Sequence, residues 1–589
     1  MKSFFKIFFA SLLALFIFTI IGVIIIIAIA AGASHHEKPY IGEKGILVLD
    51  LGVTYREQAK DNTLNNLFGG DASDNVPGLY DIVRMLHYAK YDTAIKGLLI
   101  KPGQNPNGFA TSEELRLAVL DFKQSKKFVY AYGEYFSQKD YYVASAADKI
   151  YCNPNGGVDW GGFSVKLYFL KGLLDKLEIE PEVFYAGKFK SATEPFRVTQ
   201  MTDANRLQTT VWLGDLYSDF LQKTAEARNI DTAKLHQWAN EGTIQNANDA
   251  LTHHLFDGLK YDDEIKEVLL KQTGKKGHEV NFVALGKYAD AVDFGTSGDQ
   301  EIAVLYAQGD IVTGKSSGGG EEKSIASDDF VKQIRKLRFD DNVKAIVFRV
   351  NSPGGSSLAS DEIWREISLA KKQKPVVVSM GDYAASGGYY ISCIGDSIFA
   401  DRGTITGSIG VFSIMPNMQG FFKNKLGITF DGVKTAPYAD MGSSNRPLTD
   451  AEKRFLQTDV NTIYNQFLSR VATGRKRDTA YVDSIAQGRV WTGQRAIGIG
   501  LVDRTGTLQD AVACAARMAK LNAYKTGEYP ENNFSLKGLL QGSLGGSMKA
   551  DAVKEGIGEK QYQMLLQAKK LQQMFGITQT RLPFEFDVR

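Results

Sequence analysis

Apolar and polar positions divide the chain into one long apolar run and a following series of short strands and amphipathic helices. Residues 7–31 form 25 successive positions without a charge, which is enough for a helix to cross a bilayer with some tilt. Lys2 and Lys6 precede this run, and its length favours an uncleaved anchor over a cleaved signal peptide. The positive-inside rule then keeps residues 1–6 in the cytoplasm and predicts that the rest of the chain lies on the extracytoplasmic side.

The remaining pattern alternates between buried strands and helices. Residues 344–350 and 374–380 are nearly continuous apolar runs, the type expected for strands of a largely parallel sheet. Between them, residues 360–373 have helical spacing, and Ser360 and Asp361 are well placed to cap that helix. Strands that alternate with helices predict a layered α/β domain.

A comparison of the chain with itself shows that this pattern occurs twice. Residues 133–151 align without a gap with residues 381–399 at an offset of 248, and the similarity continues beyond residue 217 with the offset drifting to 246. Such a long period indicates a tandem duplication of a whole domain rather than a solenoid. The predicted parts are a first α/β repeat, a second α/β repeat, and a C-terminal region of unknown role with a linker, a helix and a strand: residues 45–290, 301–525 and 526–589, the last helix at 559–575 and the last strand at 581–588.

Composition excludes several classes of function. The 69 basic and 67 acidic residues are well mixed along the chain, so we expect no nucleic-acid partner. Three widely separated cysteines fit neither a disulfide framework nor a zinc site, and we expect them in the core and no bound metal. Residues 309–316 match a phosphate-binding P-loop, but a Gly/Ser-rich stretch follows where that loop needs a helix, so we expect no nucleotide or other cofactor.

The two repeats differ at positions that suggest chemistry. Ser386 and the glycines after it face residues 138–140, which lack the serine, and residues 353–355 face residues 105–107, which lack the paired glycines. A serine at a strand-to-helix turn, followed by glycines, leaves main-chain N–H groups open to an anion. A second glycine turn can bring another N–H to the same point, which makes an oxyanion hole. Ser386 is therefore a candidate nucleophile, with a tight packing turn as the alternative.

The second repeat has no histidine that could act as the base for Ser386, because all seven histidines precede residue 279. Lysine can serve instead when burial lowers its pKa toward neutrality. Lys188 and Lys190 lie among apolar and small residues and are expected on one face of a strand. The second repeat has Ala439 opposite Lys190, so one repeat carries the candidate serine and the other the candidate lysine.

Four motifs together resemble the protease IV, or signal peptide peptidase A, family in its long, two-repeat, membrane-anchored form: residues 349–355, 381–392, 406–412 and 187–196. The resemblance implies a Clp-protease/crotonase-like fold in each repeat and a serine protease with a Ser/Lys dyad. It implies Ser386 as the nucleophile and Lys190, rather than Lys188, as the general base. Gly354 and Gly387 become the oxyanion donors, and Ser408 matches a serine that orients the lysine amine.

The same resemblance implies a homotetramer in the inner membrane, held to the lipid bilayer by the N-terminal helix, with its catalytic domains in the periplasm. Its substrates would be remnant signal peptides and other unfolded or extended chains, bound as an added strand. Two other functions remain open from the sequence. A crotonase-like enzyme could use the oxyanion hole on acyl thioesters, and a non-catalytic membrane scaffold could use the same motifs for packing alone.

Overall fold

The fold is described from a computed structural model of the whole chain. The described residues are 2–33, 38–59, 76–316, 324–531, 576–582 and five isolated positions, 556, 558, 561, 562 and 588. Most of the predicted helix over 559–575 and most of the predicted strand over 581–588 lie outside these residues. The loop after the P-loop-like stretch, residues 317–323, lies outside them as well.

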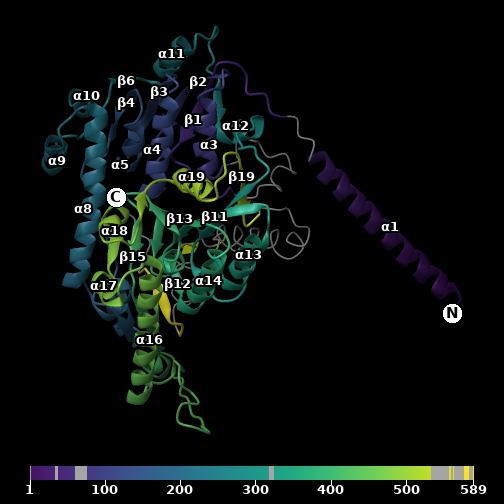
Figure 1. Cartoon of the computed structure of the whole chain (residues 1–589), viewed down its shortest axis with the longest axis vertical. Helices are drawn as coiled ribbons and strands as arrows, with labels where there is room; N and C mark the ends of the chain where they lie inside the picture. The colour runs from purple at the N-terminus through teal and green to yellow at the C-terminus, as the bar shows by residue number, and fades with distance from the viewer. Residues whose placement is uncertain are drawn as a thin grey trace.

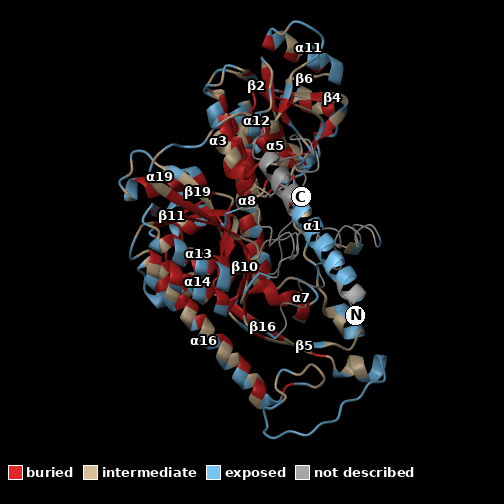
Figure 2. Ribbon diagram, turned by 90° about the vertical axis from the view of Figure 1, so that its right-hand side faces the viewer, coloured by how far each residue is buried: buried red, intermediate tan, exposed pale blue. Residues whose placement is uncertain are grey.

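The N-terminal segment forms one helix, α1, over Lys2–Ala33. Phe4 and residues 6–21 of this helix are exposed (Figure 2). Within the part of the chain that the structure describes, no helix combines the length and the apolar character that crossing a membrane requires. The anchor over residues 7–31 therefore stays a prediction.

The first repeat is built on a six-stranded sheet in which every pairing is parallel, with helices packed on its faces (Figure 1). The strands in spatial order are β6 Gly258–Leu259, β4 Lys149–Val158, β3 Phe128–Phe136, β2 Ile95–Lys101, β1 Gly45–Asp50 and β7 Phe282–Ala284. The helices are α3 Leu79–Ala89, α4 Phe109–Lys123, α5 Gln138–Ala144, α6 Lys171–Lys176, α7 Glu194–Arg197, α8 Asp203–Arg228, α9 Thr232–Glu241, α10 Ala247–Thr252, α11 Asp262–Thr273 and α12 Leu285–Ala291.

The second repeat contains the corresponding sheet, which is parallel except where β15 meets β17. Its path is β17 Val490–Thr492, β15 Ile405–Gly407, β13 Val376–Ala385, β11 Val343–Ser352, β8 Glu301–Gln308 and β19 Lys525–Tyr529. β14 Ser397–Ala400 also pairs with β13, and β18 Arg504–Thr505 pairs with β14. The helices are α13 Ser327–Phe339, α14 Ser357–Ala370, α15 Gly387–Ser392, α16 Asp450–Arg475, α17 Thr479–Ile485, α18 Gly493–Gly498 and α19 Leu508–Met518.

Alternate residues of the central strands of this second sheet face two different cores. Leu305 and Phe348 pack with α13 and α14, whereas Val304 and Val347 pack with α19. This is the layered arrangement that the alternation of strands and helices predicts. Tyr80 of α3 belongs to the α19 core, so the two repeats share apolar packing. Figure 2 shows buried positions concentrated on the sheets of both repeats.

A third sheet contains strands from both repeats and from the C-terminal region. Its order is β10 Ile325–Ala326, β9 Ile311–Val312, β12 Gly354–Ser356, β20 Gln579–Arg581, β16 Val411–Asn417 and β5 Glu180–Ala186. β5 belongs to the first repeat and pairs antiparallel with β16 of the second over seven residue pairs, from Ala186 opposite Val411 to Glu180 opposite Asn417. This pairing carries the end of β5 toward the strand-to-helix turn of Ser386.

The predicted start of one helix is wrong. α14 begins at Ser357, not at Ser360, and its N-cap is Ser356, whose side chain accepts a hydrogen bond from the Ala359 N–H. Ser360 lies inside the first turn and donates its hydroxyl to the Ser356 carbonyl. β12 ends at Ser356, so the chain passes from strand to helix without a loop. Several serines in this stretch could cap the helix by sequence alone. The end of β12 at Ser356 determines which of them is the N-cap.

Candidate active site

Ser386 lies at the turn between β13 and α15 and is fully buried. Its backbone has φ 57° and ψ −115°, a conformation that residues with a side chain rarely adopt. Its N–H donates to the Gly407 carbonyl at 2.8 Å, which helps to hold the turn. Backbone strain of this kind persists only where the surrounding structure enforces it, and it concentrates at functional sites.

The glycines around Ser386 are required by close packing. A Cβ on Gly388 would lie 2.5 Å from the Ser352 carbonyl oxygen. Gly354 has φ +108°, and a Cβ there would lie 2.8 Å from the Gly387 nitrogen. The main chains of Gly354 and Gly387, the two predicted oxyanion donors, are therefore adjacent. The Gly354 N–H donates to the Ser352 hydroxyl at 3.2 Å.

Lys190 reaches the same point from the first repeat, but not on a strand as expected. β5 ends at Ala186, and the chain turns at Gly187, whose φ is +108°. Lys188 then faces solvent, whereas Lys190 is buried with 2% of its surface exposed. The turn separates two lysines that an extended strand would have placed on one face.

Main-chain contacts from the second repeat hold the turn that carries Lys190. The Phe189 N–H donates to the Gln487 carbonyl at 2.7 Å. Gly488 lies so close that a Cβ on it would be 2.7 Å from the Lys190 nitrogen. Gln208 of α8 donates its amide to the Phe189 carbonyl at 3.1 Å and accepts from the Val490 N–H at 3.1 Å. The backbone position of Lys190 therefore depends on both repeats.

The Lys190 amine meets Ser386 and Ser408 in the interior. Its Nζ lies 2.8 Å from the Ser386 Oγ, 3.1 Å from the Ser408 Oγ and 3.2 Å from the Ser408 carbonyl oxygen. Burial, which disfavours the ammonium form, lowers the Lys190 pKa well below its ordinary value. Ser408 has φ 50° and donates its N–H to the Arg489 carbonyl at 2.7 Å. Three residues far apart in sequence thus form one hydrogen-bonded group.

The corresponding place in the first repeat is filled by other side chains. The Asp140 carboxylate accepts the main-chain N–H groups of Gly103, Gln104 and Asn105 at 3.1–3.2 Å. Gln138, which faces Ser386 in the alignment, exchanges two hydrogen bonds with the Gly162 main chain. The first repeat therefore has a loop whose amides hold an anion, but a protein carboxylate occupies it.

Buried polar contacts that the sequence did not reveal attach β13 and β11 to the first repeat. Asp382 accepts hydrogen bonds from the Thr111 N–H at 3.0 Å and the Thr111 hydroxyl at 2.7 Å. Arg349 of β11 is buried and forms ion pairs at 2.7 Å with Glu57 and Glu114, both of the first repeat. No sequence signal distinguishes these residues from surface charges, because each needs its partner from the other repeat to be buried at acceptable cost.

The sulfur and carboxylate groups do not assemble into a metal site in the region that the structure covers. No group of three or more His, Cys, Asp or Glu residues is placed to hold an ion there. The three cysteines are free and buried, as expected of core residues. Burial raises the pKa of the Cys393 thiol to about 12, so this thiol stays protonated.

Comparisons with known proteins point to one family. The model of Peptidase family S49 matches residues 121–276 and 368–522, one match in each repeat, and the model of Clp protease matches residues 300–400. Protease 4 of Salmonella typhi is 36% identical over 554 residues, which cover 91% of this chain and 87% of that protein. Protease 4 of Haemophilus influenzae is 34% identical over 520 residues, covering 84% and 83%. The chloroplastic serine protease SPPA of Arabidopsis thaliana is 32% identical over 440 residues, covering 74% and 64%.

Proposed function

Because the chain belongs to peptidase family S49 in its two-copy form, and is a serine protease, we propose that it cleaves extended peptides with a dyad of Ser386 and Lys190. The observation that carries the proposal is the 2.8 Å contact between the buried Lys190 Nζ and the Ser386 Oγ. Family membership favours this function over the acyl-thioester enzyme and the non-catalytic scaffold, neither of which needs a neutral amine beside a serine.

In this mechanism the uncharged Lys190 amine is the general base. Its lone pair accepts the Ser386 proton while the Ser386 Oγ attacks the peptide carbonyl carbon. Ser408 orients the amine, because its hydroxyl and carbonyl oxygens lie 3.1 Å and 3.2 Å from Nζ. The resulting ammonium returns the proton to the leaving amine. A water molecule, deprotonated by the same amine, then hydrolyses the acyl-enzyme ester.

The main-chain N–H groups of Gly354 and Gly387 are the proposed donors to the tetrahedral oxyanion. Their adjacency supports this role. For Gly354 the role requires its N–H to leave the Ser352 hydroxyl when a substrate carbonyl arrives. Pre-positioned donors of this kind are worth about 3–4 kcal/mol each in other serine proteases.

A serine-reactive phosphonate probe tests the proposed function directly. We expect it to phosphonylate the full-length protein at one residue, Ser386, as found by peptide mapping. Labelling should accelerate as the Lys190 amine becomes neutral, because attack on phosphorus needs the same base. Labelling of another serine, or none by a probe that reacts with a reference serine protease, would contradict the assignment.

The setting of the reaction is also part of the proposal. Residues 7–31 serve as a single membrane anchor with residues 1–6 inside, and the catalytic repeats lie on the periplasmic side of the inner membrane. The support is the uncharged run itself, Lys2 and Lys6 before it, and the single helix α1 over it. The substrates are remnant signal peptides and other unfolded or extended chains that become available at that surface.

The pairing of β5 with β16 supports the proposed homotetramer, because the equivalent segments of the two repeats are left without such a pairing. Under the repeat alignment, residues 429–435 correspond to β5 and residues 163–169 correspond to β16. Both segments are described, and neither forms a strand within this chain. In residues 429–435, Phe430 is half exposed and Val433 fully exposed. We therefore propose that residues 429–435 of one chain pair antiparallel with residues 163–169 of the next, a head-to-tail contact that can close into a ring.

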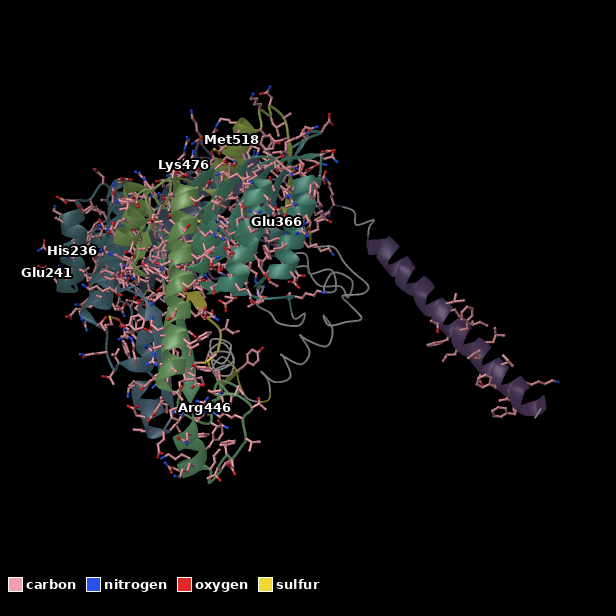
Figure 3. The ribbon with its side chains drawn as sticks, turned by 60° about the horizontal axis from the view of Figure 1, so that its bottom comes forward. His236, Glu241, Glu366, Arg446, Lys476 and Met518 are labelled. Carbon is pink, nitrogen blue, oxygen red and sulfur yellow. The ribbon has the colours of Figure 1, made fainter. Side chains whose placement is uncertain are left out.

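Substitution of Val433 by aspartate should dissociate the oligomer, because the new charge would be buried in the subunit contact. Sedimentation velocity of the detergent-solubilised protein measures the result as a shift toward monomer. Met518→Asp is the matched control, since Met518 is also exposed but belongs to α19. Figure 3 places Met518 at the opposite end of the molecule from Arg446, which follows the proposed contact segment. An unchanged sedimentation coefficient for Val433→Asp would exclude this contact.

A further inference from the structure

The C-terminal strand β20 occupies a position that an added peptide strand would take. It lies between β12 and β16 and is antiparallel to both, with Arg581 opposite Gly354, Thr580 opposite Gly355, and Gln579 opposite both Ser356 and Phe412. Removing β20 would leave β12 and β16 with unpaired edges on the two sides of a gap one strand wide. Peptide recognition by strand addition uses such edges.

This strand covers the proposed catalytic groups. The Thr580 carbonyl oxygen lies 2.0 Å from where a Cβ on Gly354 would be and 3.0 Å from where a Cβ on Gly387 would be. The main chain of β20 therefore runs directly over the two proposed oxyanion donors. Beyond it, the Leu582 N–H donates to the Pro353 carbonyl at 2.8 Å, which extends the pairing past the strand.

Leu582 anchors the segment in an apolar pocket beside the nucleophile. Its side chain is 1% exposed and belongs to one apolar cluster with Trp212 and Leu216 of α8, and with Ala385 and Ile405 of the second repeat. Ala385 directly precedes Ser386. The pocket is thus shared by both repeats, lies next to the catalytic serine and accepts an aliphatic side chain.

Apart from the Leu582 pocket, the segment is held by a short strand pairing, one ion pair and single hydrogen bonds, each of which a competing peptide can replace. β20 shares three residue pairs with β12 and one with β16, whereas β5 shares seven with β16. Arg581 adds an ion pair with Asp310 at 2.8 Å, and the Thr578 carbonyl accepts from the Ser357 N–H at 3.3 Å and from its hydroxyl at 3.1 Å. The other hydrogen bonds run from the Thr578 hydroxyl to Asp459 at 3.2 Å, from the Thr580 hydroxyl to the Gly355 carbonyl at 3.2 Å, and from the Gly576 N–H to the Ile414 carbonyl at 3.1 Å. These contacts are those of a bound peptide rather than of a central strand.

We propose that residues 578–582 are an intramolecular ligand of the peptide-binding cleft, which keeps the protease in a self-occupied form until a peptide substrate displaces them. The inference rests on the proposed function and adds to it the class of ligand: an extended peptide that places an aliphatic side chain in the Leu582 pocket. Substrate competes with a tethered segment, so its apparent affinity falls in proportion to the fraction of molecules with an open cleft.

Truncation at residue 575 should lower KM for a fluorogenic apolar peptide about ten-fold and leave kcat unchanged, which corresponds to a cleft that is open in about a tenth of the intact molecules. Leu582→Asp in the full-length chain should lower KM in the same direction, because a buried carboxylate disfavours the docked strand. Ile577→Ser is the matched control and should leave KM as it is, since Ile577 is half exposed. An unchanged or raised KM in both the truncated chain and Leu582→Asp would show that β20 is a fixed part of the fold.

A binding measurement separates this inference from the proposed function. A fluorescent peptide of residues 576–589 should bind the truncated Ser386→Ala protein saturably by anisotropy, and a peptide with Leu582→Asp should bind at least about ten-fold more weakly. Peptide binding without hydrolysis by any form of the enzyme would retain the ligand role of the strand and reject the dyad. Hydrolysis by the intact protein, without peptide binding up to about 1 mM, would reject the ligand role and retain the dyad.

Discussion

Ser386→Ala is expected to abolish peptide hydrolysis and leave the fold intact. The substitution removes the oxygen that lies 2.8 Å from the Lys190 Nζ and keeps the Cβ, so the unusual backbone of residue 386 remains as strained as before. In a serine protease, loss of the nucleophile typically lowers kcat by about 10⁵–10⁶-fold. Steady-state hydrolysis of an extended fluorogenic peptide measures the loss, and circular dichroism with a thermal melt checks the fold.

Ser392→Ala is the matched control for this experiment. Ser392 is also a buried serine, six residues further along, but its hydroxyl donates to the Gly388 carbonyl inside α15 and makes no contact with Lys190. We expect this variant to retain hydrolysis within a few-fold of the parent, the range of a single local hydrogen bond. Equal activity of Ser386→Ala and the parent would assign the chemistry to another residue.

Much of the architecture was predictable because it is repeated. The offset near 248 predicted two α/β repeats, and the structure contains the same parallel sheet order twice: β6-β4-β3-β2-β1-β7 in the first repeat and β18-β14-β13-β11-β8-β19 in the second. The helices α8 and α16 are at equivalent positions. The divergence of the repeats identified Ser386 and Lys190 as candidates, since a duplicated chain shows where one repeat keeps a group that the other has lost. The structure brings these two side chains into contact.

The parts that the sequence did not predict depend on contacts between distant segments. Lys190 lies on a turn rather than a strand because Gln487 and Gly488 of the second repeat bind the chain there. β20 covers Gln579–Arg581 and so begins before the alternating pattern at 581–588, because β12 and β16 provide edges there. The burial of Arg349 with Glu57 and Glu114 likewise follows from docking of the repeats. Local pattern carries no information on which segment will supply a partner.

Lys190→Met is expected to remove activity and to stabilise the protein at the same time. Methionine fills a similar volume but cannot accept the Ser386 proton, and loss of a general base of this kind lowers kcat by about 10⁴-fold or more. The stabilisation arises because burial lowers the Lys190 pKa well below its ordinary value. Taking this amine out of water therefore raises the free energy of the folded state, and methionine removes that destabilisation. A raised Tm together with lost hydrolysis is the expected pair of results.

The pH dependence of both quantities follows from the same lowered pKa. Between the folded-state pKa and the ordinary value near 10.5, the unfolded chain binds a proton that the folded chain does not, so stability increases with pH across this window. Below the folded-state pKa the amine is protonated in both the folded and the unfolded chain, and the destabilisation by the buried ammonium is greatest. In the parent, kcat/KM should rise with pH through the folded-state pKa as the amine becomes neutral and then reach a plateau.

Lys188→Met provides the control that assigns these effects to one amine. Lys188 is two residues away on the same turn but faces solvent. Its substitution should therefore leave kcat/KM, its pH profile and the Tm close to those of the parent. Lys190→Met should instead lose the contribution of this amine to the rise of stability with pH. Retained hydrolysis in Lys190→Met, or a kcat/KM profile that rises only near the pKa of free lysine, would be incompatible with a buried neutral amine acting as the base.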